Sequence, residues 1–165
     1  MLTFDIRRAG ASDASGIAAA HLDSIRSLGA MHYEPAIVRE WGGGIGADRY
    51  LQAMALGEAF FIATGDLSGV PAILGFSSHR VDEDEHRTAV YVRGSAARQG
   101  VGSALFRAAE ADVIASGGTS IHVDASLAAV EFYRAHGFEE IGRGEHRLRS
   151  GQTMACVFMR KDLSR

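Results

Sequence analysis

The hydrophobic pattern of the first third of the chain predicts one strand followed by three helices, over residues 3–7, 12–28, 37–41 and 49–56. The first segment alternates polar and apolar residues, which is typical of a half-buried strand. Ser12 and Asp13 precede apolar residues spaced three or four positions apart, so we expect them to cap a helix that Gly29 ends. Pro35 lies where the first turn of the next helix is expected.

The remainder of the chain predicts strands with two further helices among them. Strands are expected over residues 59–64, 72–81, 88–92, 121–124, 139–148 and 153–159, and helices over residues 101–113 and 126–135. Residues 65–71 predict a hairpin turn. We expect Ser126 to cap the last helix and Gly137 to end it. This order predicts an α+β (mixed α/β) fold in a single domain, residues 1–165.

Composition and charge exclude several classes of function. The 165 residues include 17 basic and 20 acidic side chains, a formal net charge of −3, whereas a general nucleic-acid binder is normally basic. The single cysteine, Cys156, forms no internal disulfide, which fits a reducing compartment. Residues 1–6 lack the basic lead of a signal peptide, and no apolar run reaches the length of a membrane span. We therefore expect a cytoplasmic protein that binds neither nucleic acid nor membrane.

The histidines show no metal-ligand spacing with carboxylates, so we interpret them as structural or surface residues and expect no metal. Glycine is more informative, because 20 glycines stand against 2 prolines. This is about 12% glycine against an average of roughly 7%, which indicates loops where the backbone comes close to another group.

Residues 90–105 carry the clearest chemical signal, since they predict a strand, a loop with two glycines, and the start of a helix. Free backbone N–H groups and the positive end of the helix dipole suit a diphosphate at such a place. A dinucleotide fingerprint needs a third glycine where Leu105 stands, and no Gly-Lys-Ser/Thr follows for a nucleotide-binding loop. A tight turn without a ligand stays open as an alternative.

Two motifs in this region resemble a known family. Arg98-Gln-Gly-Val-Gly-Ser-Ala-Leu105, after Val90-Tyr-Val92, resembles the acyl-CoA-binding motif of the GCN5-related N-acetyltransferases. Asp124-Ala-Ser-Leu-Ala-Ala-Val-Glu-Phe-Tyr-Arg-Ala-His-Gly-Phe138 resembles that family's second signature. The resemblance covers essentially the whole chain. It implies a mixed, mostly antiparallel sheet whose central strands splay into a V that holds acyl-CoA, with helices on both faces.

The resemblance also implies roles for individual residues. Backbone groups of Tyr91 and Val92 are expected to pair with the pantetheine arm. The diphosphate is expected on the amides of Arg98, Gln99, Gly100, Val101, Gly102 and Ser103. Tyr133 matches the tyrosine that in many relatives protonates the departing CoA thiolate. The chain departs from the family pattern at Gly94, Ala97 and Ala128. The last position often carries an asparagine, whose hydrogen bond to the cofactor is lost here.

Acetyl transfer to an amine sets further requirements. An amine with a pKa near 10.4 is neutral in only about one part in 2,500 at pH 7, which corresponds to roughly 4.6 kcal/mol. Glu85, followed by His86, precedes the motif strand where some relatives place a base, although a solvated loop is the alternative. The acidic run 82–85 favours a basic acceptor. We expect the amide of Val92 to stabilise the oxyanion.

The sequence therefore predicts an acetyl-CoA-dependent N-acetyltransferase that acetylates a primary amine by direct transfer in a ternary complex. The amine acceptor, a small molecule or a protein, stays open. Tyr33 and Trp41 are expected to line its pocket, with simple packing of the short helix as the alternative. A non-catalytic CoA-binding or sensor module on the same fold is the competing function. Homodimerisation is also left open.

Overall fold

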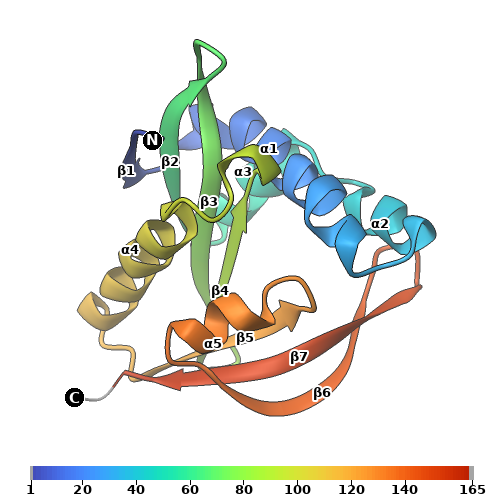
Figure 1. Cartoon of the computed structure of the whole chain (residues 1–165). Coiled ribbons are helices and arrows are strands. Elements are labelled where there is room, and N and C mark those ends of the chain that lie inside the picture. The colour runs from blue at the N-terminus through green and yellow to red at the C-terminus, as the bar shows by residue number, and fades with distance from the viewer. Residues whose placement is uncertain (1, 164–165) are drawn as a thin grey trace.

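A computed structural model describes residues 2–163, which form one seven-stranded sheet in the order β1-β2-β3-β4-β5-β7-β6 (Figure 1). The strands are β1 Phe4–Arg8, β2 Ala59–Leu67, β3 Val70–Asp82, β4 Glu85–Val92, β5 Ser120–Ser126, β6 Glu139–Arg147 and β7 Thr153–Asp162. The α-helices are α1 Ala14–Ser27, α2 Pro35–Gly42, α3 Ala47–Ala55, α4 Val101–Ala115 and α5 Val130–Ala135. Neighbouring strands are antiparallel except β4 and β5, which are parallel. The mixed, mostly antiparallel sheet is confirmed.

The alternation of side chains along β2 shows how the helices cover the sheet. Phe60 and Ile62 pack with α1 and α3 on one face. Phe61 and Ala63 point the other way and pack with the start of α4. Because α5 shares a hydrophobic cluster with α4, these two helices lie on the same face (Figure 1). Helices on both faces, as predicted, leave the middle of the sheet buried.

The sheet opens between β4 and β5. These parallel strands share a single pairing, Arg87 with His122, close to the start of β4. Further along, β4 continues to Val92 without a strand partner on that edge, because the two strands diverge (Figure 1). This is the predicted V-shaped splay. It leaves backbone N–H and C=O groups of β4 facing a gap.

Some local predictions were wrong. The β2–β3 hairpin turns over Ser68 and Gly69 alone, both with positive φ, so the strands extend into the predicted turn. Helix α5 begins at Val130, because Ser126 pairs with Cys156 of β7 and remains in the strand. At the first helix, Ser12 lies in a 3-10 turn ahead of α1 and does not cap it.

Asp13 also does not cap α1 with its side chain. Its carboxylate binds the Arg7 guanidinium at 2.9 and 3.0 Å and accepts a hydrogen bond from the Gly10 N–H at 2.9 Å. Gly137 ends α5 with a φ of +93°, as its position in the sequence predicted. Within residues 2–163, none of the helices has the length and apolar character to cross a membrane.

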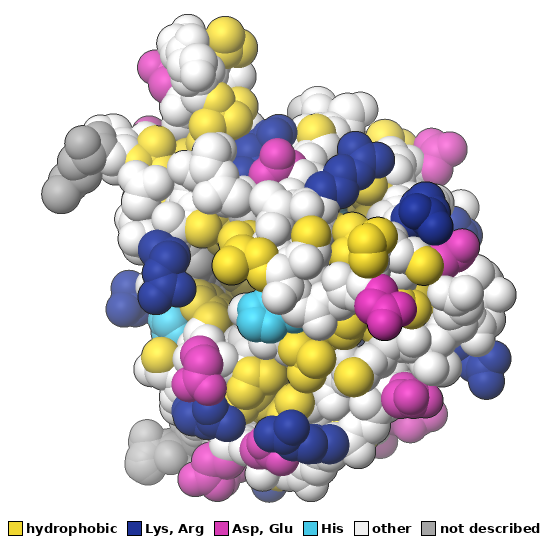
Figure 2. All heavy atoms as spheres, turned by 45° about the vertical axis from the view of Figure 1, so that its right-hand side comes forward, with side chains coloured by type: hydrophobic (Ala, Val, Ile, Leu, Met, Phe, Trp, Pro, Cys, Tyr) yellow, Lys and Arg dark blue, Asp and Glu magenta, His cyan; other side chains and the backbone are white. Residues whose placement is uncertain are grey.

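Figure 2 shows the side of the molecule that is turned to the right in Figure 1. Basic and acidic side chains are interspersed on it, and hydrophobic side chains gather between them. This face therefore presents charges of mixed sign around an apolar area.

Candidate active site

The loop between β4 and α4 presents a row of free backbone donors. The first backbone bond of α4 runs from the Ala104 N–H to the Gly100 carbonyl at 3.1 Å. Among residues 2–163, the amides of residues 98–103 donate no hydrogen bond to the protein. Arg98 and Gly100 have φ values of +60° and +87°, which bend the backbone into a concave turn. Such a turn at the positive end of a 15-residue helix is suited to an anion.

The side chains of this loop divide into two groups. Arg98 is exposed beside the free amides and forms no ion pair with a described residue. Gln99 instead donates its side-chain amide to the Ser95 carbonyl at 3.2 Å, which holds the loop together. Gly100 has open space around it, whereas a Cβ at Gly102 would lie 3.0 Å from a ring carbon of Phe132. Gly102 is therefore required by the packing of α4 on α5, independently of any ligand.

The hydrogen-bond pattern of β4 decides which backbone groups face the gap. The Arg93 N–H binds the Leu74 carbonyl of β3 at 2.8 Å. Because hydrogen-bonded and non-bonded pairs alternate in an antiparallel ladder, Tyr91 directs its amide and carbonyl towards Phe76 of β3. Val92 directs its own into the gap between β4 and β5. The expected backbone contact to a pantetheine arm thus fits Val92 and does not fit Tyr91.

Tyr133 places its hydroxyl in the same gap. The ring is 2% exposed and packs edge-on against Phe138. Its oxygen accepts a hydrogen bond from the Val90 N–H at 3.1 Å, so α5 reaches the splayed edge of β4. Burial raises the pKa of Tyr133 well above its usual value of 10.0, which keeps the hydroxyl protonated around neutral pH. The hydroxyl hydrogen remains available to a further acceptor.

A cavity of about 300 Å³ lies on the face of the sheet that α1 and α3 cover. Its lining includes Trp41 of α2, Tyr50 of α3 and Tyr91 of β4. Leu148 and Cys156, from the β6–β7 side of the splay, line the cavity across from them. The side chain of Tyr91 thus belongs to this cavity although its backbone faces β3. The cavity meets the splay from the side opposite to α4 and α5.

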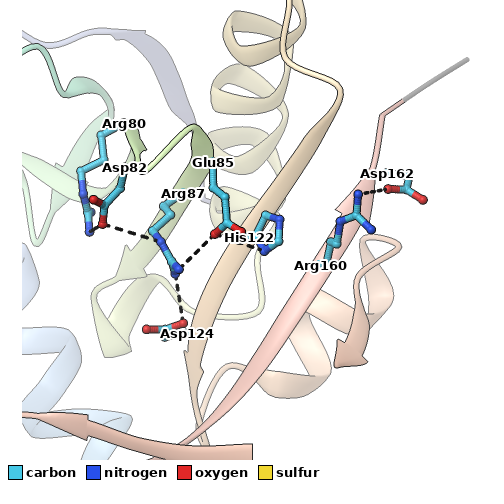
Figure 3. Close-up of polar contacts among 8 residues, drawn as sticks. All are labelled: Arg80, Asp82, Glu85, Arg87, His122, Asp124, Arg160 and Asp162. Atoms are coloured by element: carbon cyan, nitrogen blue, oxygen red, sulfur yellow. Dashed lines mark hydrogen bonds and ion pairs between the residues drawn. The ribbon is translucent and has the colours of Figure 1, made fainter. Parts of the chain in front are cut away.

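The structure places Glu85 away from this centre. Its carboxylate forms an ion pair with Arg87 at 3.2 Å and lies 3.7 Å from His122 Nδ1, and Arg87 also reaches Asp124 at 3.2 Å (Figure 3). Glu85 begins β4, five residues before Val90, which is about 17 Å along an extended strand. It does not line the cavity. A direct role as the base is therefore not supported by the geometry, since proton transfer needs hydrogen-bond reach.

The acidic run 82–85 likewise does not line the cavity. It forms the tip of the β3–β4 hairpin, where Asp82 pairs with Arg80 and Arg87 at 3.8 Å (Figure 3). Arg80 and Arg87 come from the two strands of the hairpin and pair with Asp82 and Glu85, whereas Glu83 and Asp84 form no ion pair with a described residue. The expectation that this run attracts a basic acceptor therefore has no support in the structure.

Tyr33 and Trp41 occupy different positions. The Tyr33 hydroxyl donates to the Ala155 carbonyl at 2.5 Å and accepts from the Leu127 N–H at 2.8 Å. Both bonds tie the segment before α2 to the far side of the splay. Trp41 packs edge-on between Tyr33 and Tyr91 and lines the cavity. Trp41 therefore faces the cavity, whereas Tyr33 does not line it and its hydroxyl holds the two sides of the splay together.

His21 is a cavity residue whose position the sequence did not reveal. It is 4% exposed, its Nδ1 lies 2.5 Å from the Tyr50 hydroxyl, and its ring packs on Tyr91 at 4.0 Å. Burial, with a smaller contribution from the Arg49 charge, lowers the pKa of His21 to about 3, so the imidazole is neutral. Its Nε2 has no hydrogen-bond partner among the described residues. From the sequence we interpreted His21, on an apolar helix face, as a satisfied structural or surface histidine, and its unpartnered Nε2 differs from that expectation.

Comparison with known proteins identifies the family. A family model described as an acetyltransferase (GNAT) domain matches residues 30–163. The chain belongs to the GNAT acetyltransferases. No curated protein sequence matches it.

Solved structures of other GNAT proteins share the fold. A GCN5-related N-acetyltransferase from Rhodopseudomonas palustris is 28% identical, with a TM-score of 0.82 over 99% of this chain and 98% of that one. The PaiA N-acetyltransferase of Thermoplasma acidophilum, solved with coenzyme A, is 13% identical with a TM-score of 0.74, covering 98% and 99%. A GNAT phosphinothricin acetyltransferase from Sinorhizobium meliloti, solved with acetyl-CoA, is 19% identical with a TM-score of 0.73, covering 99% and 90%.

Proposed function

We propose that this GNAT protein transfers an acetyl group from acetyl-CoA to a primary amine, directly and in a ternary complex. One observation carries the proposal. The free amides of residues 98–103, the unpaired edge of β4 and the Tyr133 hydroxyl lie in succession along one side of the splay. The acceptor cavity meets the splay from the other side. A thioester and an amine can thus approach each other from opposite faces of the sheet.

Acetyl-CoA binding follows from the free backbone groups. The diphosphate accepts hydrogen bonds from the amides of residues 98–103, and Arg98 adds a positive charge beside them. The pantetheine arm extends along β4 and pairs with the backbone of Val92, as an added strand would. Coenzyme A and acetyl-CoA in two of the structural relatives support this choice of co-substrate.

The reaction forms a C–N bond and breaks the C–S bond of the thioester. A neutral amine from the cavity attacks the acetyl carbonyl, and the Val92 N–H stabilises the oxyanion that develops. Collapse of the intermediate releases the CoA thiolate, and the amine nitrogen gives its proton to solvent water. The Tyr133 hydroxyl supplies a proton to the sulfur, the Val90 N–H stabilises the phenolate that this leaves, and the phenolate takes a proton back from solvent before the next turnover. Transfer is uphill, because each unit by which the tyrosine pKa exceeds that of the thiol adds about 1.4 kcal/mol.

Calorimetry and a free-thiol assay test the proposal together. Acetyl-CoA should bind where NAD and ATP do not, and an amine panel should include at least one acceptor that releases thiol. Arg98→Glu should weaken acetyl-CoA binding about 10- to 100-fold, since it replaces a charge-assisted contact with repulsion. Arg107→Glu, an equal charge change on an exposed position of α4, should leave affinity within about threefold.

Absence of binding heat with acetyl-CoA, or equal affinity loss in both variants, would contradict the assignment of the loop. Binding without thiol release from any amine would instead identify a CoA-binding module without transferase activity.

A further inference from the structure

The charges around the acceptor cavity are unlike those of the whole chain. The chain has a formal net charge of −3. The lining of the cavity nevertheless contains five arginines and only three acidic residues. The arginines are Arg49, Arg80, Arg87, Arg147 and Arg149, and the acids are Glu40, Glu58 and Asp124. An acidic protein therefore directs an excess of positive charge into one cleft.

Ion pairing separates these arginines into two groups. Arg80 and Arg87 are neutralised by carboxylates of β3, β4 and β5 (Figure 3). Arg49, Arg147 and Arg149 form no ion pair within residues 2–163. The unpaired acids Glu40 and Glu58 come from α2 and from the residue before β2, on the same wall as Arg49. The opposite wall, from β6 and the turn after it, contributes Arg147 and Arg149 and no carboxylate to the lining.

Arg149 is held across the end of the cavity. Its guanidinium and Cδ lie where a Cβ at Gly44 would stand, so the glycine makes room for them in the α2–α3 loop. Gly44 itself has a φ of +80°. The β6–β7 turn and the α2–α3 loop, far apart in the sequence, thus meet at the lining of the cavity through a guanidinium.

We propose that the amine acceptor carries an anionic group, a carboxylate or a phosphoryl group, which Arg147 and Arg149 bind while the amine points into the splay. This rests on the function proposed above and names the chemical class of its acceptor. Arginine matches such anions with two parallel hydrogen bonds. A cavity of about 300 Å³ is at the lower end of the range for small-molecule sites, roughly 300–1,000 Å³. A small amino acid or aminophosphonate satisfies both conditions.

The wall that faces Arg147 and Arg149 carries charges of both signs. The charge of Arg49 lowers the pKa of His21 and opposes the burial that raises the pKa of Tyr91. Glu58 acts in the opposite direction, since its charge contributes to raising the pKa of Tyr50. The excess of positive charge therefore lies with Arg147 and Arg149, where the anion of the acceptor binds.

Matched acceptors provide the test. Leucine, phenylalanine and glutamine are each compared with two derivatives of the same amino acid. In the carboxamide the α-carboxylate loses its negative charge, and in the aminophosphonate a negatively charged phosphonate replaces it. We expect kcat/KM to be about 10- to 100-fold lower for the carboxamides than for the better anion, although carboxamide amines are less basic and more often neutral. Comparing kcat/KM for the amino acids with kcat/KM for the aminophosphonates shows which of the two anions the site binds better.

Variants localise the effect. Arg147→Gln and Arg149→Gln should each raise the KM for the anionic acceptor about 10-fold or more, and leave the KM for acetyl-CoA unchanged. Arg143→Gln, also on β6 but paired with Glu140 outside the cavity, is the matched control and should change neither KM. Calorimetry of the same compounds with the CoA-bound protein gives the comparison independently of turnover.

Equal or faster acetylation of the carboxamides, equal binding of all three forms, or equal effects of the three arginine variants would overturn the proposal. None of these results affects acetyl-CoA binding or thiol release with other amines. Failure of acetyl-CoA binding would instead refute the proposed function itself.

Discussion

Replacing Tyr133 with Phe removes one oxygen atom from the centre of the splay. The ring stays, so the packing against Phe138 in the α4–α5 cluster is preserved. Two things are lost: the hydroxyl proton proposed for the CoA sulfur, and the acceptor of the Val90 N–H at 3.1 Å. The substitution therefore affects both catalysis and stability, and their magnitudes separate the two effects.

The effect on catalysis should be much larger than the loss of folded protein. Removing a general acid typically lowers the rate about 10²- to 10⁴-fold. One buried hydrogen bond contributes about 1 kcal/mol, and an unpaired N–H costs about 1–3 kcal/mol. Since a domain of this size is stable by about 5–15 kcal/mol, more than about nine-tenths of the variant remains folded at 25 °C. Its melting temperature should fall by about 2–4 °C for each kcal/mol.

The assay is thiol release at saturating acetyl-CoA and amine, with thermal unfolding of the same samples. Ser77→Ala is the matched control, because it deletes a buried hydroxyl that donates to the Leu105 carbonyl at 2.8 Å, outside the cavity. It should lower stability similarly without lowering kcat. Because the pKa of Tyr133 is raised, the wild-type rate should not decline between about pH 7 and 9 through loss of its proton. A kcat of Tyr133→Phe within about threefold of wild type would refute the role as acid.

Two further predictions concern stability. Burial lowers the pKa of His21 from 6.5 to about 3, so between these values the unfolded chain binds a proton that the folded chain does not. The free energy of unfolding should therefore fall by about 1.4 kcal/mol per pH unit as the pH drops through this window, and His21→Asn should reduce that slope in urea titrations; identical slopes would contradict the burial argument. Gly137→Ala should cost about 1 kcal/mol, because its φ is +93° and the new Cβ would lie 3.2 Å from the Lys161 side chain. Gly10→Ala, at an extended and open position, is the control and should cost less in the same titrations.

Much of the fold could be predicted because its signals are local. Periodicity and turn residues identified nearly every strand and helix, and Pro35 and Gly137 marked helix ends correctly. The errors lie where a tertiary contact overrides a local preference. Ser126 is a good capping residue, yet its pairing with β7 keeps it in the strand. Asp13 is also a good capping residue, yet its carboxylate accepts hydrogen bonds from the Arg7 guanidinium instead.

The sequence by itself determined the family and the glycine-bearing turn between β4 and α4, because a strand, closely spaced glycines and a helix start are consecutive residues whose geometry follows from their own backbone. Only the tertiary structure decided which groups of that backbone face the splay, since this depends on the register between β3 and β4. It also decided the charge of the cavity. At the acidic hairpin tip Asp82 and Glu85 pair with Arg80 and Arg87, whereas Arg49, Arg147 and Arg149 are brought to one cleft from elements far apart in the chain. Coulomb interactions depend on distance in space, which spacing along a sequence does not give.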